Sequence, residues 1–473
     1  MRVEVVEEYA STLSDQDDHP YRSGCWKPNH QELNAWDLEV KGELPSDLQG
    51  VYVRNTENPL HDSLGRYHPF DGDGMLHSIF FDGQSVQYRN RFIRTDGFNA
   101  EREAGRALWG GLLERPEKSE RDGWGARTAL KDSSSTDVVV HRGRVATSFY
   151  QCGDVYELDP KTLEQMGKAD WLAGVTPGWG VSAHTKVDEA TNELLFFNYS
   201  KQAPYMHYGV VDGQGNLVHY IPIELPGPRL PHDMGFTDNY AVLHDFPFFW
   251  DPEALKHNAH AVRFRTDMPT RFGVVPRRGQ PGDVRWFEAK PTYALHVINT
   301  YEDGDTIVMD GFAQKDPTHF SLVETGCHAY RWRMNLRTGE VTEGPLEEAL
   351  SEFGMINPAH AGKPYRFSWA VTSPPKFFAM NGLVRLDAET GQRQEYPLPE
   401  GVFLSESPMA PRQGSTAEDD GYVVTFVTDV NADESGCWVF DAQDITTGPI
   451  ARVKLPKRIC VGTHSYWADI SKL

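Results

Sequence analysis

The stretch LVRLDAETGQRQEYP, residues 383–397, contains the pattern that decides the fold: two short strand-like runs joined by a turn that begins with aspartate and ends with glycine. The aspartate side chain can accept hydrogen bonds from the backbone of its own turn, and glycine adopts the positive φ that a hairpin needs. Turns of this kind recur at irregular spacing, at Asp82–Gln84, Asp188–Asn192, Asp212–Asn216, Asn335–Gly339 and Asp387–Gly391. Repeated strand–turn–strand units of this kind are typical of β-propeller blades.

Strand-forming runs rich in Val, Ile, Phe, Tyr and Thr fill much of the remaining sequence, and long helical periodicity is nearly absent. The clearest runs lie at 50–55, 78–95, 137–150, 193–200 and 421–430. Three stretches, 100–115, 252–259 and 345–354, have helical periodicity and are predicted to be helical insertions in loops. Because no linker rich in Pro, Gly or Ser divides the chain, one propeller domain over 1–473 is predicted, with capping insertions near 98–130 and 245–262.

The length of the chain sets the size of this propeller. A chain of 473 residues is longer than the ~250–300 residues at which a single ordinary core stops growing. At roughly 40–50 residues for each blade, it would form about six to eight blades.

The charge and the cysteines bound the partners and the compartment. The net charge of −22 repels phosphate backbones and anionic lipids, so neither nucleic-acid binding nor stable membrane insertion is expected. The five cysteines are widely spaced and form no CxxC pair, which favours a reducing compartment without a disulfide framework. With no secretory leader and no long apolar run, a cytoplasmic protein is predicted; the sequence indicates no oligomeric state.

Four of the 18 histidines stand apart by their context: His184, His232, His296 and His464. Each lies next to an apolar, strand-like run, and they are separated by distances of about one blade or more. Since the inner strands of a propeller all approach its central axis, one histidine on each of several blades can meet there without a short sequence motif. Neutral imidazoles suit iron, copper, nickel or zinc, so the four predict a metal site.

The motifs around these histidines resemble those of the carotenoid cleavage dioxygenase family over most of the chain, from about residue 39 to residue 467. GVYVRNTENP (50–59) and YHPFDGDGMLHSIFF (67–81) look like the family's glycine-rich first blade. AHTKVD, LPHDMGFT, HVINTYE and THSYW look like the segments that carry its four iron-binding histidines. The resemblance implies an all-β, seven-bladed β-propeller with a helical and loop cap over a central iron site, in which these histidines bind Fe(II).

The family resemblance also implies glutamates that hold three of the iron-binding histidines from behind. Glu352, in SEFGMINP, and Glu406, in LSESPMAPR, match two of these positions. The third position falls on Gln151, in TSFYQCGDVYELDP, which departs from the family pattern. A glutamine can still accept a hydrogen bond, but it brings no charge to the site.

Within the family, the sequence resembles the enzymes that act on lignostilbenes, isoeugenol and 4-vinylguaiacol. The similar stretches are RFIRTDGFNAEREAGRALWGG (91–111) and GVVPRRGQPGDVRWFEA (273–289). Lys131 matches a lysine that binds the substrate's para-hydroxyl in the lignostilbene enzymes, and Phe98 takes the place of their tyrosine. By this resemblance Lys131 would stabilise a phenolate, and Phe98 would contribute shape and stacking.

The predicted function is a non-haem Fe(II)-dependent oxygenase that uses O₂ to cleave the side-chain double bond of a phenolic alkene (4-vinylguaiacol, isoeugenol or a hydroxystilbene), giving an aromatic aldehyde such as vanillin and a second carbonyl product. Three alternatives remain, one of which is hydrolytic or isomerising chemistry on the same scaffold. An apocarotenoid 15,15′-type cleavage dioxygenase would use the same iron site with a longer apolar substrate. A non-catalytic propeller that binds partners would carry the four histidines as structural residues.

Overall fold

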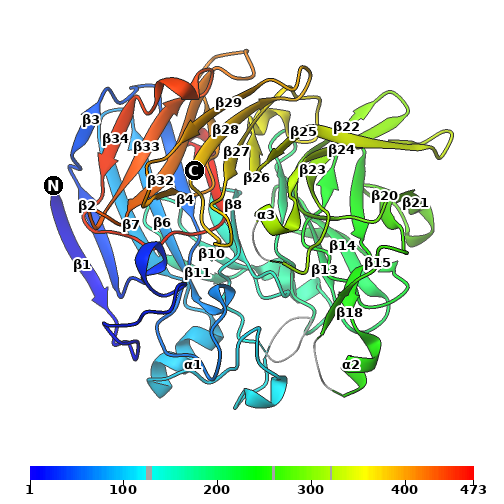
Figure 1. The fold of residues 1–473 in the computed structure, drawn as a ribbon, viewed down its shortest axis with the longest axis horizontal. Coiled ribbons are helices and arrows are strands. Elements are labelled where there is room, and N and C mark those ends of the chain that lie inside the picture. The colour runs from blue at the N-terminus through cyan, green and yellow to red at the C-terminus, as the bar shows by residue number, and fades with distance from the viewer. Residues whose placement is uncertain (124–129, 258–260, 320–321) are drawn as a thin grey trace.

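The strands form antiparallel sheets that follow one another along the chain and radiate from a common centre, as in a propeller (Figure 1). The computed structural model describes residues 1–123, 130–257, 261–319 and 322–473. Within these ranges the strands form seven sheets of four or more strands and one two-stranded sheet. The fold is an all-β propeller, as predicted.

The first, second and third sheets come mostly from the N-terminal half. The first consists of β1 (Arg2–Glu8), β2 (Gln31–Trp36), β7 (Val86–Phe92), β6 (Asp73–Asp82), β4 (Gln49–Arg54) and β35 (Ser465–Asp469) in that order, with β5 (Glu57–Asn58) beside β6. The second is β8 (Asp137–His141), β9 (Arg144–Ser148), β10 (Tyr156–Leu158) and β11 (Gln165–Lys168). The third is β12 (Lys186–Asp188), β13 (Glu193–Tyr199), β14 (Tyr205–Val211) and β15 (Leu217–Glu224).

The fourth to seventh sheets complete the ring. The fourth is β16 (Gly235–Phe236), β17 (Tyr240–Asp245), β20 (Thr270–Pro276) and β21 (Arg285–Ala289). The fifth is β22 (Tyr293–Asp303), β23 (Thr306–Gln314), β24 (His328–Asn335) and β25 (Val341–Leu350); the sixth is β26 (Glu352–Ile356), β27 (Phe367–Thr372), β28 (Gly382–Asp387) and β29 (Arg393–Pro397). The seventh is β3 (Val40–Gly42), β34 (Ala451–Lys454), β33 (Glu434–Asp441), β32 (Gly421–Asp429) and β30 (Val402–Leu404), with β31 (Met409–Pro411) beside β32.

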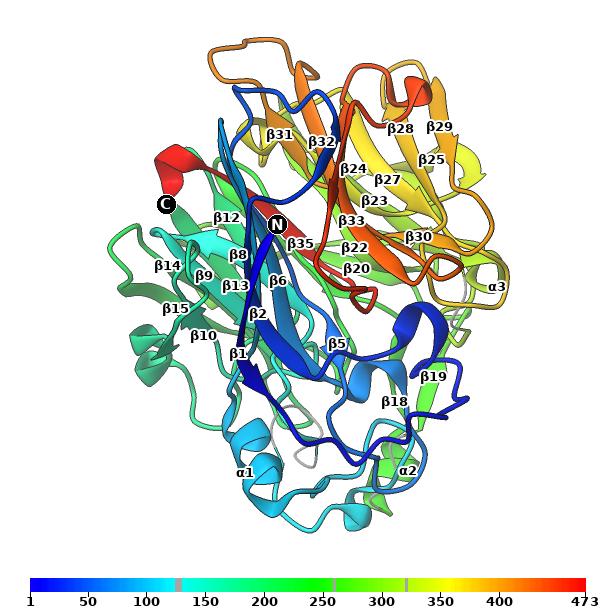
Figure 2. The ribbon, with the colours of Figure 1, turned by 90° about the vertical axis from the view of Figure 1, so that its left-hand side faces the viewer.

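The two ends of the chain close the ring by exchanging strands. The C-terminal strand β35 pairs with β4 in the first sheet, and the N-terminal strand β3 pairs with β34 in the last sheet. Figure 2 shows the red C-terminal strand running beside the blue N-terminal strands. This exchange of strands joins the two ends of the chain and closes the ring.

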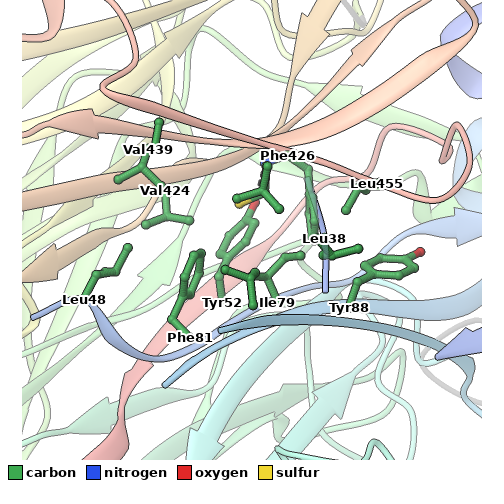
Figure 3. Packing of buried hydrophobic residues seen from close by; sticks show 14 of the residues in the cluster. Leu38, Leu48, Tyr52, Ile79, Phe81, Tyr88, Val424, Phe426, Val439 and Leu455 are labelled. Carbon is green, nitrogen blue, oxygen red and sulfur yellow. Dashed lines mark hydrogen bonds between the residues drawn. The ribbon is translucent and has the colours of Figure 1, made fainter. Parts of the chain in front are cut away.

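The joint between the first and last sheets has an apolar core. Tyr52 from β4 and Phe81 from β6 pack with Val424 and Phe426 from β32, and all four are buried (Figure 3). Removing a fully buried ring such as that of Phe426 costs roughly 3–5 kcal/mol. The joint therefore holds the first and last parts of the ring in register.

The repeated turns form as the sequence predicts. Asp212, between β14 and β15, accepts backbone hydrogen bonds from Gln214 at 2.9 Å and from Asn216 at 2.8 Å. Asp387, at the end of β28, accepts backbone hydrogen bonds from Glu389 and Thr390 in the turn that leads to β29. These turns set the length and register of the outer hairpins.

Short helices and loops gather at one end of the molecule, where α1 (Asp96–Ala104) and α2 (Pro252–Lys256) lie in both views (Figures 1 and 2). A two-stranded sheet of β18 (Phe248–Trp250) and β19 (Val262–Phe264) flanks α2, and α3 (Leu322–Thr325) follows β23. Single turns of 3₁₀ helix lie at Gly24–Trp26, Pro69–Asp71, Pro116–Lys118, Asp170–Gly174, Pro281–Asp283, Pro358–His360, Ile445–Thr447 and Ile470–Lys472.

Of the three predicted helices, two overlap helices of the structure and one does not. The helix expected at 100–115 begins earlier, at Asp96, and ends at Ala104, because Gly105 adopts a positive φ of 65° that stops it. The helix expected at 252–259 covers Pro252–Lys256, while residues 258 and 259 lie outside the described residues. The prediction of a helix at 345–354 is wrong. Residues 345–350 belong to β25 because Val341–Leu350 pairs with β24, and residues 352–354 belong to β26.

Candidate metal centre

The four predicted histidines converge at the centre of the propeller. Their candidate ligand nitrogens all lie within 4.8 Å of one another. His184, His232 and His464 lie one to three residues before the strands β12, β16 and β35, respectively. His296 lies within β22. Each of these strands is the end strand of its sheet. The structure thus brings together four imidazoles that are as much as 280 residues apart in sequence (464 − 184).

The spacing and environment of the four imidazoles fit one divalent transition-metal ion. Nitrogens bound on opposite sides of an ion at about 2.1 Å each would be about 4.2 Å apart. Nε2 of His184 and Nε2 of His296 are buried and have no hydrogen-bond partner among the described residues. Burial holds the pKa of His232 and of His296 well below its ordinary value, so these rings are neutral, as a metal ligand must be.

Three of the histidines are held from behind by carboxylates. Nδ1 of His184 lies 2.8 Å from Oδ2 of Asp137, Nδ1 of His296 lies 2.6 Å from Oε2 of Glu352, and Nδ1 of His464 lies 3.2 Å from Oε1 of Glu406. A hydrogen bond at Nδ1 fixes the ring so that Nε2 faces the centre, which is the usual support for a metal-binding histidine.

These seven residues are distributed one to each large sheet. His464, His184, His232 and His296 come from the first, third, fourth and fifth sheets, while Asp137, Glu352 and Glu406 come from the second, sixth and seventh. Asp137 is the first residue of β8 and Glu352 the first of β26, so both lie where an end strand begins. Each carboxylate therefore reaches the histidine of a neighbouring sheet.

Sequence reasoning missed Asp137. It stands at the start of the strand-like run DVVVH, the same position relative to a strand that singled out the histidines. Its carboxylate is buried, accepts the backbone N–H of Val138 at 2.7 Å, and faces His184 with its other oxygen. The family resemblance implies glutamates at the supporting positions and so does not point to this aspartate.

Gln151, which was predicted to support one of the histidines, forms no hydrogen bond to any of the four histidines in the described structure. Gln151 is buried, and its Oε1 has no hydrogen-bond partner among the described residues. Carboxylates contact Nδ1 of the other three histidines, and within the described ranges no such contact is found for the half-buried His232.

Burial and the contacts between carboxylates and histidines shift the pKa values of Glu352 and His464. Burial raises the pKa of Glu352 to about 8. Burial lowers the pKa of His464, but the carboxylate of Glu406 outweighs that effect and raises it to about 9. A divalent ion at the four Nε2 atoms would displace these protons and favour ionised carboxylates, so metal binding is expected to release protons.

Phe353 completes the wall beside the histidines. It has a positive φ of 55°, a strained backbone conformation for a bulky residue. Its ring centroid lies 4.7 Å from that of His296 and 5.1 Å from that of His464. The strained backbone holds the phenyl ring against two of the four histidines.

A large, mostly apolar cavity of about 740 Å³ opens on one side of the histidines. Its wall includes His232, His296 and His464, and aromatic rings such as those of Tyr67, Phe70, Trp250, Tyr293 and Phe353. Leu112 and Leu113 from the first predicted cap segment and Trp250 and Val262 from the second also line it. Residues 124–129 of the first segment and 258–260 of the second lie outside the described residues.

A second, smaller cavity of about 180 Å³ also borders the cluster of histidines but has a mostly different set of wall residues. It shares His296 and His464 with the larger cavity, and its wall includes His184, Asp137 and Glu406. The four histidines therefore lie between an apolar chamber and a more polar one.

Lys131 and Phe98 are not in the wall of either chamber. The ammonium of Lys131 lies 2.6 Å from Oδ1 of Asp73 and 2.6 Å from Oε2 of Glu101, in the wall of a separate cavity of about 40 Å³. Phe98 is buried in an apolar cluster, stacked on Phe92 with ring centroids 5.0 Å apart. The small cavity shares the wall residues Tyr67 and Phe70 with the large one. Lys131 therefore lines a pocket that adjoins the large cavity and does not line that cavity itself.

An all-β propeller with four converging imidazoles, carboxylates behind them and an apolar chamber in front combines a candidate metal site with a chamber that can hold a small molecule. The model of the family described as retinal pigment epithelial membrane protein (RPE65) matches residues 26–469. The chain belongs to this family, that of the carotenoid cleavage oxygenases.

Relatives with different substrates in their names match the chain equally well. The isoeugenol monooxygenase of Pseudomonas nitroreducens is 29% identical, covering 95% of this chain and 98% of that protein. The carotenoid 9,10(9′,10′)-cleavage dioxygenase 1 of Phaseolus vulgaris is also 29% identical, covering 96% and 90%. The crystal structure of the lignostilbene dioxygenase of Pseudomonas brassicacearum has a TM-score of 0.86 at 27% identity, covering 96% and 99%.

These relatives are named as dioxygenases or monooxygenases, and the chain is an oxidoreductase that incorporates oxygen from O₂. The alternative of a non-catalytic binding propeller is not supported. Among the helices of the described ranges, none has the length and apolar content needed to span a bilayer.

Proposed function

We propose that this protein is a non-haem Fe(II)-dependent oxygenase that cleaves the side-chain double bond of a phenolic alkene, such as 4-vinylguaiacol, isoeugenol or a hydroxystilbene. The products would be an aromatic aldehyde, vanillin in the guaiacyl cases, and a second carbonyl compound. The observation that carries the proposal is the chamber of about 740 Å³, which has three of the four histidines in its wall and aromatic rings around them.

The donor set supports iron. Four neutral imidazoles suit iron and would leave the charge of a bound Fe(II) undiminished. Fe(II), when bound, supplies the redox chemistry that O₂ requires. We propose that His184, His232, His296 and His464 hold it, with Asp137, Glu352 and Glu406 fixing three of the rings.

The chain's own part in the reaction is to position the alkene and to exclude water. Phe353 covers His296 and His464, and the other aromatic rings of the chamber offer flat surfaces on which a conjugated substrate can stack.

We further propose that the seven large sheets are the blades of a seven-bladed propeller, and that residues 1–473 form one domain. The exchange of strands between the chain ends supports this, since β35 and β3 each complete a sheet from the opposite end. One metal-centre residue from each sheet gives every blade a position at the common axis.

Apocarotenoid cleavage is the second candidate. The chamber is large enough for a substrate longer than a vinylphenol, and the carotenoid cleavage dioxygenase of Phaseolus vulgaris is as similar in sequence as the isoeugenol enzyme. Identity and volume therefore favour neither substrate class over the other.

A product assay tests the proposal. The Fe(II)-loaded protein is supplied in air with 4-vinylguaiacol, isoeugenol, a hydroxystilbene and an apocarotenal, each in a separate reaction. Aromatic aldehyde is expected from at least one phenolic alkene, with ¹⁸O from ¹⁸O₂ in the carbonyl products. Cleavage of the apocarotenal alone would overturn the phenolic assignment.

A further inference from the structure

Two buried acceptor oxygens without partners lie in the wall of the large chamber. Oε2 of Glu57 and Oε1 of Gln151 have no hydrogen-bond partner among the described residues. Glu57 is 2% exposed and Gln151 is 5% exposed. A buried oxygen with no partner costs roughly 1–3 kcal/mol, so a ligand that donates a hydrogen bond to it would recover that cost.

Glu57 is tied to the metal end of the chamber. It belongs to the short strand β5, whose backbone pairs with Gly74 of β6. Its Oε1 accepts a hydrogen bond from the hydroxyl of Thr463 at 3.1 Å, and Thr463 directly precedes His464. One carboxylate oxygen is therefore anchored, and the other is left for whatever enters beside the histidine.

Glu57 also differs in kind from the carboxylates that support the histidines. Asp137, Glu352 and Glu406 each contact an imidazole Nδ1, whereas no hydrogen bond to a histidine ring involves Glu57 in the described structure. A carboxyl group that supports no ligand histidine and lies in the wall of a mostly apolar chamber is suited to binding substrate.

We propose that Glu57, assisted by Gln151, binds a hydroxyl group that the alkene carries, and so selects hydroxylated alkenes over hydrocarbons. This inference rests on the proposed function, because it assigns the substrate class of the same chamber. The hydroxyl donates its proton to Oε2 of Glu57. A polyene hydrocarbon offers no donor and would leave both oxygens buried and unpaired.

The hydroxyl could be allylic or phenolic, and two matched pairs of ligands separate these sources. Coniferyl alcohol and isoeugenol differ only in the allylic hydroxyl. Isoeugenol and its O-methyl ether differ in the phenolic hydroxyl. Dissociation constants are measured by calorimetry with the Fe(II)-loaded protein under strictly anaerobic conditions, so that binding is observed without turnover.

Wild-type protein is expected to prefer the hydroxylated member of one pair by roughly tenfold to a hundredfold, which is the range for a hydrogen bond to a charged group. Glu57→Leu should abolish that preference, and Glu57→Gln, which keeps an acceptor oxygen, should retain part of it. Gln314→Leu is the matched control, because Gln314 lies in the same chamber wall but its side-chain atoms are not among the buried atoms that lack a partner; it should leave the preference unchanged.

Thermal melting and iron content establish whether each variant is folded and loaded. If Glu57→Leu does not fold, Gln151→Leu takes its place, with a smaller loss of preference expected. The proposal is overturned if the wild type shows no preference in either pair or binds none of the ligands. It is also overturned if the preference survives in both Glu57→Leu and Gln151→Leu. A preference that Glu57→Leu removes, in a protein that cleaves no alkene, would sustain this inference and refute the proposed function.

Discussion

Replacing Asp137 tests the support of the metal centre at the position that the sequence did not reveal. The carboxylate of Asp137 lies 2.8 Å from Nδ1 of His184, and both side chains are buried. Removing the partner behind a metal-binding histidine typically lowers metal affinity about 10- to 100-fold, or roughly 1.4–2.7 kcal/mol. Asp137→Ala also leaves the Nδ1–H of His184 buried and unpaired, so its effect should reach about 100-fold.

Asp137→Asn provides the graded comparison. The amide oxygen of asparagine can still accept from Nδ1–H of His184, while the charge is lost, so a loss of about tenfold is expected. Competition between the protein and an Fe(II) chelator, carried out without O₂, gives the dissociation constant of each variant.

The control must be a buried aspartate that is remote from the histidines. Asp387 closes a turn at the end of β28 and accepts a hydrogen bond from Arg366 at 2.7 Å. Asp387→Asn is expected to lower the melting temperature and leave Fe(II) affinity unchanged. If Asp137→Ala bound Fe(II) as tightly as the wild type, the role assigned to this carboxylate would be wrong.

Three further predictions concern other residues. His296→Ala should retain less iron after desalting than His232→Ala, because the carboxylate of Glu352 fixes the proposed ligand His296, whereas no carboxylate contact is found for the proposed ligand His232 in the described ranges. Metal analysis showing the reverse order would contradict this. Burial lowers the pKa of His244 to about 4 against an ordinary 6.5, so the unfolded chain takes up a proton first as the pH falls, and the stability penalty grows from pH 6.5 down to pH 4. Between pH 7.5 and 5, His244→Phe should therefore lose about 2 kcal/mol less than the wild type in urea unfolding, and an equal loss would refute the assignment. Lys131→Met should lower the melting temperature because it leaves two buried carboxylates facing each other without their cation, and the phenolate role further requires a greater loss of kcat/KM on isoeugenol than on its methyl ether.

The parts of the fold that the sequence predicted are those fixed by local chemistry. The turn at Asp212 forms through hydrogen bonds to residues two and four positions later, so its outcome depends on only a few neighbours. The helix predicted at 345–354 failed for the opposite reason. Its spacing of apolar residues was helical, but pairing with β24 along Val341–Leu350 satisfied the backbone and determined the conformation.

The candidate site divides in the same way. The four histidines were found because each sits beside a strand-like run, and the propeller brings such positions to one axis. The contact between Asp137 and His184 joins residues 47 positions apart on different sheets, and no local pattern marks it. The surroundings of Lys131 and Phe98 depend on how the first cap segment packs, which spacing in the sequence does not encode.

The most direct measurement is a titration of the metal-free protein with Fe(II) in the absence of O₂, followed by exposure to O₂ in the presence of 4-vinylguaiacol. Vanillin formed in each sample should rise in proportion to added iron and level off at one Fe(II) per chain, and His296→Ala should form none. Vanillin formation that is independent of iron, or a wild-type protein that binds one Fe(II) at the four histidines and cleaves no phenolic alkene, would contradict the proposed function.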